Sequence, residues 1–238
     1  MLYDSSRIGN ATPEWFDPQW WAGRGTVTAA AEGRGSASLI QADGRQLVLR
    51  HYRRGGFIAR ISRDRYLWRS PEQTRSFHEW RLLYGLRRAG LPVPAPLAAS
   101  YQRTGRTYVA DLLLERLLGV RSLAEAVRAG PVSLATWVNI GRVLRRFHAS
   151  GVYHADLNAH NVLLGAGDEV WLIDFDRGAL RSPGWWCDSN LVRLLRSLEK
   201  LTAPLPPEHF TSSDWHSLLD SYIAAGPEFA ERTARALP

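Results

Sequence analysis

The sequence predicts an α+β protein with two lobes, in which a small antiparallel sheet is followed by a mainly helical half. Three segments of strand character follow one another near the N-terminus, and the dipeptide Asp43-Gly44 between two of them is a strong hairpin signal. A proline-rich, extended connector at residues 91–96 separates these strands from a half with helical periodicity. We therefore expect a first lobe at residues 1–115 and a second at 116–238.

The elements of the first lobe are an irregular or short helical lead-in, a sheet and one helix. Apolar side chains recur at mostly helical spacings from Phe77 to Leu86, and Gly90 ends the pattern, so residues 75–88 are predicted to form the helix. The lead-in is rich in aromatic residues and covers residues 1–22. The predicted strands cover residues 26–31, 37–41, 46–52 and 108–114.

The second lobe is predicted to contain four helices and two short apolar strands that flank a turn. A serine cap starts the first helix, and the second helix is strongly amphipathic. The predicted helices cover residues 122–129, 134–149, 188–201 and 215–225, and the strands cover residues 162–164 and 170–173.

Composition and length indicate a soluble globular protein that can bury a core. No stretch approaches the roughly 20 apolar residues that span a bilayer, and residues 1–10 lack the apolar centre of a signal peptide. Cys187 is the only cysteine, so an internal disulfide is excluded, which fits a reducing compartment. We expect the protein in the cytoplasm, either free or peripherally bound to a membrane.

The net charge of +7 indicates an anionic partner: a nucleotide, a nucleic acid, an acidic sugar or an anionic lipid. Lys200 is the only lysine, so the remaining basic residues are arginines, whose forks bind phosphate and carboxylate groups bidentately. Eight of them lie between Arg45 and Arg69, interleaved with aromatic residues. This arginine-rich segment could bind nucleic acid, grip an acidic sugar or phospholipid head group, or form a solvated face.

Two motifs of the second lobe carry the chemistry. Residues 154–161 read H-A-D-L-N-A-H-N and match the catalytic-loop pattern H-x-D-L-x-x-x-N, while Asp174-Phe-Asp resembles the metal-binding D-F-G. Asp156 is expected to accept the proton of an attacking hydroxyl, and Asn161 and Asp174 to hold magnesium. Each could singly be a turn residue, but the three at this spacing predict phosphoryl transfer from ATP. The histidine that begins the loop is expected to be structural.

The candidates for ATP binding lie in the first lobe. The turn containing Gly33 and Gly35 joins two strands and could fold over nucleotide phosphates, although such pairs are often plain turns. Kinases usually place a lysine on the third strand, but here Arg50 stands in that slot, with Glu79 as its natural partner on the following helix. The alternative is a surface arginine and a solvated glutamate. Glu115, at the end of the last strand, is also assigned to the ATP site.

Departures from the protein-kinase pattern indicate a small-molecule-type kinase without activation-loop control. Ala155 precedes the catalytic aspartate where many protein kinases have an arginine, and Asp176 replaces the glycine of D-F-G. No A-P-E segment follows, and the chain after Asp176 is too short for the full helical lobe of a regulated protein kinase.

The motifs together resemble the lipopolysaccharide kinase family with its protein-kinase-like fold, and within it the kinases of 3-deoxy-D-manno-octulosonic acid (Kdo). The stretch Arg50-His-Tyr-Arg-Arg-Gly-Gly56 is the most discriminating part, and the similarity covers nearly the whole chain. The similar runs are residues 49–56, 64–68, 91–94, 111–115, 154–164 and 173–177.

This resemblance implies ATP- and Mg²⁺-dependent phosphorylation of the 4-hydroxyl of Kdo on Kdo-lipid A, during synthesis of the lipopolysaccharide inner core. It implies a peripheral position on the cytoplasmic side of the inner membrane, with an anionic membrane surface as partner and neither nucleic acid nor an obligate protein partner. By motif, Asp156 is the base and Asn161 and Asp174 are metal ligands, and Asp188 is expected to support the catalytic loop. The alternatives are a heptose, aminoglycoside or atypical protein kinase, a pseudokinase, or a nucleic-acid-binding module.

Overall fold

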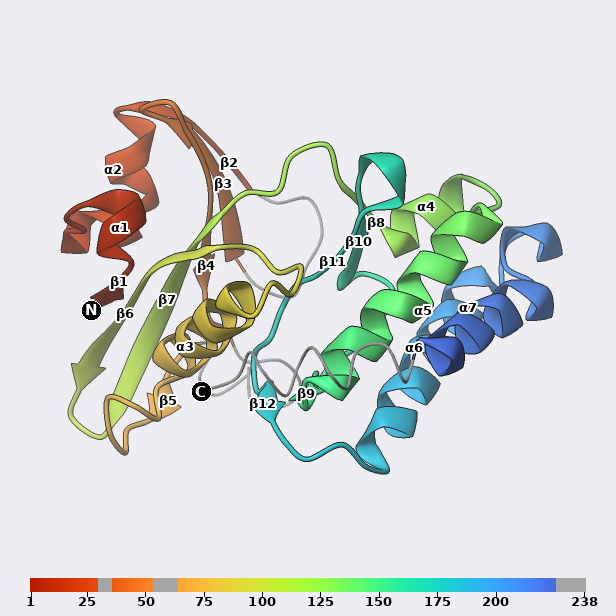
Figure 1. Cartoon of the computed structure of the whole chain (residues 1–238). Coiled ribbons are helices and arrows are strands. Elements are labelled where there is room, and N and C mark those ends of the chain that lie inside the picture. The colour runs from red at the N-terminus through yellow and green to blue at the C-terminus, as the bar shows by residue number, and fades with distance from the viewer. Residues whose placement is uncertain (30–35, 54–63, 226–238) are drawn as a thin grey trace. The chain divides into compact units, whose positions relative to one another are not determined.

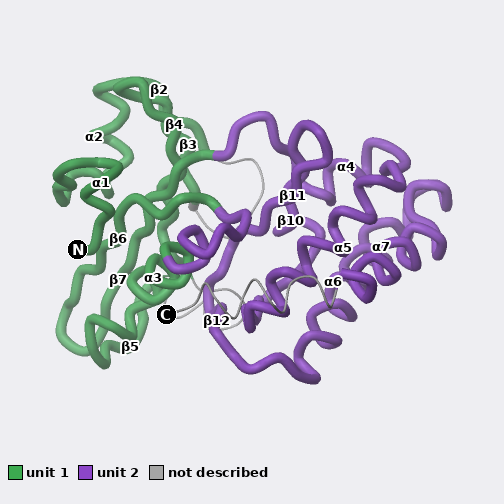
Figure 2. The backbone as a smooth tube through the Cα atoms, in the orientation of Figure 1, with its two compact units in different colours: residues 1–84, 94–116 green, residues 85–93, 117–238 purple. Residues whose placement is uncertain are grey.

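The computed structural model describes residues 1–29, 36–53 and 64–225, which form two compact units (Figure 2). The first contains residues 1–84 and 94–116, and the second contains residues 85–93 and 117–238. The predicted boundary lies at residue 115, whereas the end of the predicted helix 75–88 and the first part of the predicted connector, together residues 85–93, group with the second unit. They do so because the Pro92 carbonyl accepts a hydrogen bond from the Leu172 amide at 3.0 Å, and the Gly90 carbonyl accepts one from Arg146 at 2.9 Å.

The first unit is built on an antiparallel sheet with the strand order β1-β6-β7-β4-β3-β2 (Figure 1). A further short strand, β5, pairs with β7 beyond the end of β4. The strands are β1 Leu2–Tyr3, β2 Gly25–Ala29, β3 Ser36–Ala42, β4 Arg45–His51, β5 Tyr66–Leu67, β6 Pro96–Thr104 and β7 Thr107–Glu115.

The predicted hairpin at Asp43-Gly44 is confirmed. Asp43 has φ 51° and Gly44 has φ 70°, and two consecutive positive φ values are the signature of a type I′ turn. The turn pairs Ala42 with Arg45 and so fixes the β3–β4 register.

Strand β6 is the longest strand that the sequence analysis does not predict, since it treats residues 91–96 only as an extended connector. The chain instead continues from Pro96 as a nine-residue strand between β1 and β7. Pro96 is the first residue of this strand, which is a position where proline is tolerated in a sheet.

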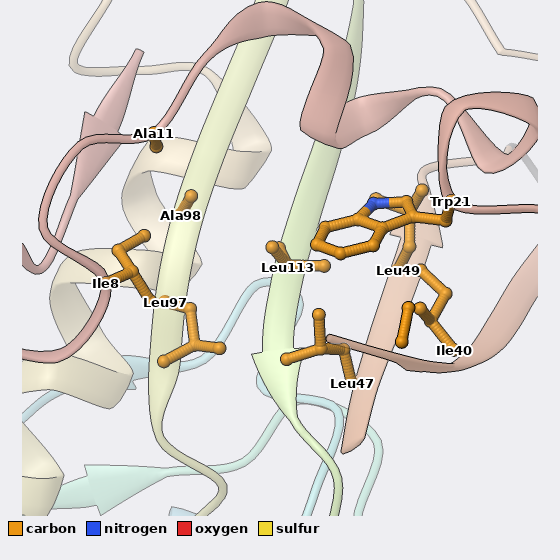
Figure 3. Packing of buried hydrophobic residues seen from close by; sticks show 10 residues of the cluster. Ile8, Ala11, Trp21, Ile40, Leu47, Leu49, Leu97, Ala98 and Leu113 are labelled. Atoms are coloured by element: carbon orange, nitrogen blue, oxygen red, sulfur yellow. The ribbon is translucent and has the colours of Figure 1, made fainter. Parts of the chain in front are cut away.

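The two faces of the sheet are covered by different segments. On one face the helices α1 (Ser5–Ile8) and α2 (Pro18–Ala22) and the 3-10 turn η1 (Pro13–Phe16) pack against the sheet. Trp21 is fully buried there against Leu47, Leu49 and Leu113 (Figure 3). Strand β4 therefore alternates, with Leu47 and Leu49 pointing to this face.

The predicted helix α3 (Arg75–Arg88) is confirmed with the same bounds. Its N-terminal part lies on the sheet, where Ser76 Oγ donates to the Ser100 carbonyl at 2.7 Å and the Phe77 ring lies 5.1 Å from that of Tyr101.

The described part of the second unit contains four α-helices and two small sheets (Figure 1). One sheet has the order β11-β10-β8, and β12 pairs with β9 in the other. The helices are α4 Leu123–Ala129, α5 Leu134–Ala149, α6 Trp186–Thr202 and α7 Ser212–Ala224. The strands are β8 Arg121–Ser122, β9 Val152–Tyr153, β10 Val162–Leu164, β11 Val170–Leu172 and β12 Ala179–Leu180, and the 3-10 turns are η3 Ala166–Asp168 and η4 Pro207–His209.

Helices α5 and α7 pack closely at Gly141, where α5 has no side chain between the two backbones. A Cβ atom at this position would collide with the Leu218 carbonyl and the Ser221 hydroxyl of α7. His148 lies near the end of the same contact, where its buried ring shares a 2.9 Å hydrogen bond with the Tyr222 hydroxyl. Burial lowers the pKa of His148 to about 4, so the ring is neutral at physiological pH.

Replacing Gly141 with alanine should therefore destabilise the protein by about 1–3 kcal/mol, because the added methyl group must push α7 away from α5. Urea unfolding of the two proteins measures this difference. Gly85→Ala is the matched control, because it makes the same substitution within a helix, α3, at a position where a Cβ would meet nothing within 4 Å. That variant should be as stable as the parent, or more stable by up to about 1 kcal/mol. Equal effects of both changes would contradict the close helix contact.

Candidate active site

The loop between β9 and β10, residues 154–161, is held from inside by the ring of His154. This ring is buried, its Nε2 donates to the Ile173 carbonyl at 2.9 Å, and its Nδ1 accepts from the Asp156 amide at 3.2 Å. These two bonds select the Nε2–H tautomer of a neutral imidazole. Burial lowers the pKa of His154, which preserves that form. The predicted structural role of His154 is consistent with all of these contacts.

Helix α6 holds the same loop from outside through Asn190. The Asn190 side chain is buried, and it accepts from the His154 amide at 3.2 Å while donating to the His154 carbonyl at 2.9 Å. Asp188 was expected to fill this role, and that prediction is wrong in its residue. Asp188 is exposed. It stands two positions before Asn190 on α6, and two positions correspond to a rotation of roughly 200° about the helix axis, so the two side chains point to opposite sides.

Asp156, the predicted base, has a fixed backbone and an exposed carboxylate. Its carbonyl accepts hydrogen bonds from the side-chain amides of Asn158 at 3.0 Å and Asn161 at 2.9 Å. The side chain is 56% exposed, and its Oδ1 lies 3.6 Å from Nη1 of Arg193 on α6. The carboxylate is thus presented to solvent from a rigid loop, where an acceptor hydroxyl could reach it.

The two predicted magnesium ligands are brought together by the β10–β11 hairpin. The Asn161 carbonyl accepts a hydrogen bond from the Ile173 amide at 3.1 Å, and Asp174 is the next residue. Asp174 has φ 62°, a left-handed conformation that non-glycine residues adopt rarely and that recurs at functional sites. The Asn161 Nδ2 is used by the Asp156 carbonyl, so the amide oxygen is the atom that could bind a cation.

This donor set fits magnesium. Within the described residues there is no cluster of three or more His, Cys, Asp or Glu side chains that could hold a metal ion. Magnesium does not need such a cage, because it is commonly bound by one or two carboxylates together with substrate phosphates and water. One carboxylate and one amide oxygen match that mode, from Asp174 just after β11 and Asn161 just before the adjacent β10.

Phe175 anchors the predicted metal-binding segment to the core of the second unit. Its ring is completely buried, with centroids 5.8 Å from Phe147 on α5 and 4.7 Å from the His154 imidazole. The hydrophobic contact therefore ties Asp174 to the same histidine that positions the base.

In the first unit, the expected contact between Arg50 and Glu79 is present. Arg50 Nη1 lies 2.9 Å from Oε1 and 3.2 Å from Oε2 of Glu79. The Glu79 side chain is only 1% exposed, and the Tyr52 hydroxyl also donates to it. A buried carboxylate requires such partners, so Arg50 is oriented by the sheet and α3 together. Its predicted role in holding phosphates stays a prediction.

The remaining candidates for the ATP site are Gly33, Gly35 and Glu115. Gly33 and Gly35 lie outside the described residues, as does part of the arginine-rich segment, residues 54–63. The Glu115 side chain is bound by Arg7, whose Nη1 lies 2.7 Å from Oε2. The Glu115 amide donates to the Ala95 carbonyl at 2.9 Å, which fixes the end of β7.

Next to Arg50, His51 connects two carboxylates that sequence reasoning left unassigned. Its Nδ1 lies 2.7 Å from Oδ1 of Asp111 on β7, and its Nε2 lies 3.4 Å from Oδ2 of Asp64. The hydrogen bond to Asp111 is the main cause that raises the pKa of His51. Through these two contacts the His51 ring joins β4 and β7 to Asp64, near the end of the arginine-rich segment.

Sequence reasoning also missed Asn190, although a signal for it exists. The buried positions of α6 are Trp186, Asn190, Leu191, Leu194 and Leu198, which follow helical spacing. An asparagine within an otherwise apolar stripe must find hydrogen-bond partners in the interior, and here these partners are the backbone groups of the catalytic loop.

Most of the chain is similar to known proteins. Residues 18–222 match the model of the lipopolysaccharide kinase (Kdo/WaaP) family. The chain is 51% identical over 202 residues to a 3-deoxy-D-manno-octulosonic acid kinase of Xylella fastidiosa (strain 9a5c), covering 84% of this chain and 80% of that protein. It is 51% identical over 203 residues to the enzyme of the same name from Stenotrophomonas maltophilia (strain R551-3), with the same coverage.

A 3-deoxy-D-manno-octulosonic acid kinase of Xanthomonas campestris pv. campestris (strain B100) is 50% identical over 202 residues, again covering 84% of this chain and 80% of that protein. These similarities confirm the predicted family resemblance and the α+β, protein-kinase-like fold class. They do not favour the pseudokinase and nucleic-acid-binding alternatives. Among the described helices, none combines the length and apolar character needed to cross a bilayer.

Replacing Asn190 with alanine should lower kcat by roughly 10- to 100-fold, because two buried backbone groups of His154 lose their partners and the loop is no longer fixed. Steady-state kinetics together with ATP titration would test this, and the affinity for ATP should change little. Asp188→Ala, on the exposed side of the same helix, is the control and should match the parent. The assignment fails if the Asp188 variant is the impaired one.

Proposed function

This chain belongs to the lipopolysaccharide kinase (Kdo/WaaP) family, and we propose that it transfers the γ-phosphoryl group of ATP to the 4-hydroxyl of Kdo in Kdo-lipid A. The reaction is a phosphotransfer to an alcohol during synthesis of the lipopolysaccharide inner core. The observation that carries the proposal is the exposed Asp156 carboxylate on a loop fixed from both sides, in a chain half identical to Kdo kinases.

The catalytic roles follow from the requirements of phosphoryl transfer, which are positioning and charge stabilisation rather than covalent chemistry. Asp156 accepts a hydrogen bond from the 4-hydroxyl, orients its oxygen towards the γ-phosphorus and takes up the proton. Asn161 and Asp174 hold Mg²⁺, which when bound neutralises charge on the β- and γ-phosphates. The buried ring of His154 keeps the base and Asp174 in a fixed relation, because it bonds to both segments.

In the first unit, Arg50 takes the part of the missing strand lysine and binds the α- and β-phosphates of ATP. The contact with Glu79 orients the guanidinium, whose planar fork matches the geometry of phosphate oxygens. Gly33 and Gly35 are assigned to the phosphate-covering turn and Glu115 to the nucleotide site, from their positions in the sequence.

The acceptor is a lipid, so we also propose that the protein binds peripherally to the cytoplasmic side of the inner membrane. Residues 180–185 support this, since all six are exposed and include Leu180 at 57% and Trp185 at 79%. Tryptophan favours the membrane interface, and two exposed arginines, Arg181 within the segment and Arg177 three residues before it, suit anionic head groups. The segment starts at β12, which pairs with β9 directly before the catalytic loop.

The function is tested by incubating the protein with ATP, Mg²⁺ and Kdo-lipid A in detergent micelles and identifying the phosphorylated lipid by mass spectrometry. Asp156→Asn should lose roughly 10²- to 10⁴-fold in turnover while its ATP affinity stays close to that of the parent, because only the proton acceptor is removed. Phosphorylation of heptose or protein instead of Kdo would contradict the acceptor. Unchanged turnover of Asp156→Asn would contradict the assigned base.

Membrane binding is tested by sedimentation with vesicles containing anionic lipids. The double change Leu180→Ser and Trp185→Ser should weaken binding by roughly 10-fold or more, because two large apolar side chains no longer enter the interface. Leu134→Ser is the control, since Leu134 is 62% exposed but lies at the opposite end of α5 from β9. If the control reduces binding equally, residues 180–185 do not form the membrane contact.

A further inference from the structure

Arg193 is the only charged side chain among the described residues that makes an ion pair with the predicted base. Its Nη1 lies 3.6 Å from Oδ1 of Asp156, and the two side chains are 52% and 56% exposed. This distance exceeds that of a good N–H···O hydrogen bond. Exposed ion pairs of this kind contribute little to stability, so the fold does not explain why an arginine stands here.

The position of Arg193 is fixed by its neighbours on α6. Asn190 lies one turn earlier and binds the backbone of His154, and Ser197 lies one turn later and accepts a hydrogen bond from the Ala159 amide at 3.1 Å. Residues spaced by three or four positions share one face of a helix. One face of α6 therefore runs along the catalytic loop, with Arg193 in the middle opposite Asp156.

The contacts of Arg193 leave its guanidinium available to a ligand. Within residues 1–29, 36–53 and 64–225, the structure records no other ion pair or hydrogen bond of this side chain. The predicted magnesium ligands approach the loop from the β10–β11 hairpin, whereas Arg193 approaches it from α6. An anion bound by Arg193 is therefore expected on the acceptor side of Asp156 rather than among the metal-bound phosphates.

We propose that Arg193 binds the carboxylate of the acceptor sugar and so selects a sugar acid over a neutral sugar. This inference rests on the proposed function, in which Asp156 contacts the 4-hydroxyl of Kdo. In Kdo the carboxylate is attached to C2, two ring carbons from C4, so a guanidinium beside the base is within reach of it. Arginine matches a carboxylate with two parallel N–H···O bonds, which gives both affinity and orientation.

The proposal is tested with two acceptors, Kdo-lipid A and the same lipid with the Kdo carboxylate converted to a primary amide. The parent protein should prefer the acid by roughly 10- to 100-fold in kcat/KM, the range expected for charge-assisted hydrogen bonds. Arg193→Gln should lose this preference, mainly through a higher KM for the acid, while its kcat/KM for the amide stays near that of the parent. Arg193→Lys should keep part of the preference, because it keeps the charge without the fork.

Arg196→Ala is the control, because this arginine of α6 is also exposed but, among the described residues, makes no ion pair with Asp156. It should retain the parent's preference for the acid. Equal use of both acceptors by the parent would overturn the assignment without any variant and would leave the kinase function standing. An equal loss on both acceptors in Arg193→Gln would also overturn it, since the arginine would then act on phosphoryl transfer. Failure of the parent to phosphorylate either acceptor would overturn the proposed function and this assignment together.

Discussion

The second unit depends on one constraint in the predicted catalytic loop, residues 154–161. This loop belongs to no helix or sheet, yet its buried backbone groups need hydrogen-bond partners. Unpaired buried amides and carbonyls are costly, so the loop keeps its shape only with side-chain partners. Asn190 supplies partners for two of them at His154, and the His154 ring supplies one for the Asp156 amide while it also donates to the Ile173 carbonyl after β11. The shape of the loop is thus encoded in α6 and in the segment after β11, far away in sequence.

A second constraint of the same kind operates in the first unit. Glu79 brings a carboxylate into the interior, and this is tolerable only because Arg50 and Tyr52 of the β4 segment meet it there. The pair fixes the N-terminal part of α3 on the sheet and at the same time orients the guanidinium. An arginine can do both because its planar fork is rigid, which makes lysine a poor substitute at this position. The absence of a strand lysine is therefore compatible with a working phosphate anchor.

Sequence alone predicted the features that depend on local periodicity and turn chemistry. The helices α3 and α5 and the strand β10 have the predicted bounds, and Asp43-Gly44 forms the predicted hairpin. Helix α7 begins at Ser212, three residues before the predicted start, because the Thr211–Asp214 capping box extends it. Strand β6 was missed because its pairing with β1 and β7 is not local, and prolines precede it.

For the site, the sequence offered candidates for the chemistry, whose roles stay predictions, but it did not show which residues hold these candidates in place. Asp156, Asn161 and Asp174 stand in a motif whose spacing is visible in the chain, and the Arg50–Glu79 contact follows from strand and helix order. Asn190 contacts His154, which lies 36 positions earlier in the sequence, and Arg193 contacts Asp156 at a similar separation. Only the packing of α6 shows which face of this helix meets the loop. That is also why Asp188 was chosen in place of Asn190.

The second unit divides stability and chemistry between different side chains. The groups that hold the loop, His154, Asn190 and Phe175, are buried, and their contacts are satisfied within the unit. Asp156 and Arg193 are half exposed, and an exposed pair at 3.6 Å adds little to folding. Opposite charges that neither stabilise the fold nor bond tightly to each other remain free to exchange their contact for a hydroxyl and a carboxylate. The same weakness that makes the pair poor as a structural element makes it suitable for binding an acidic sugar.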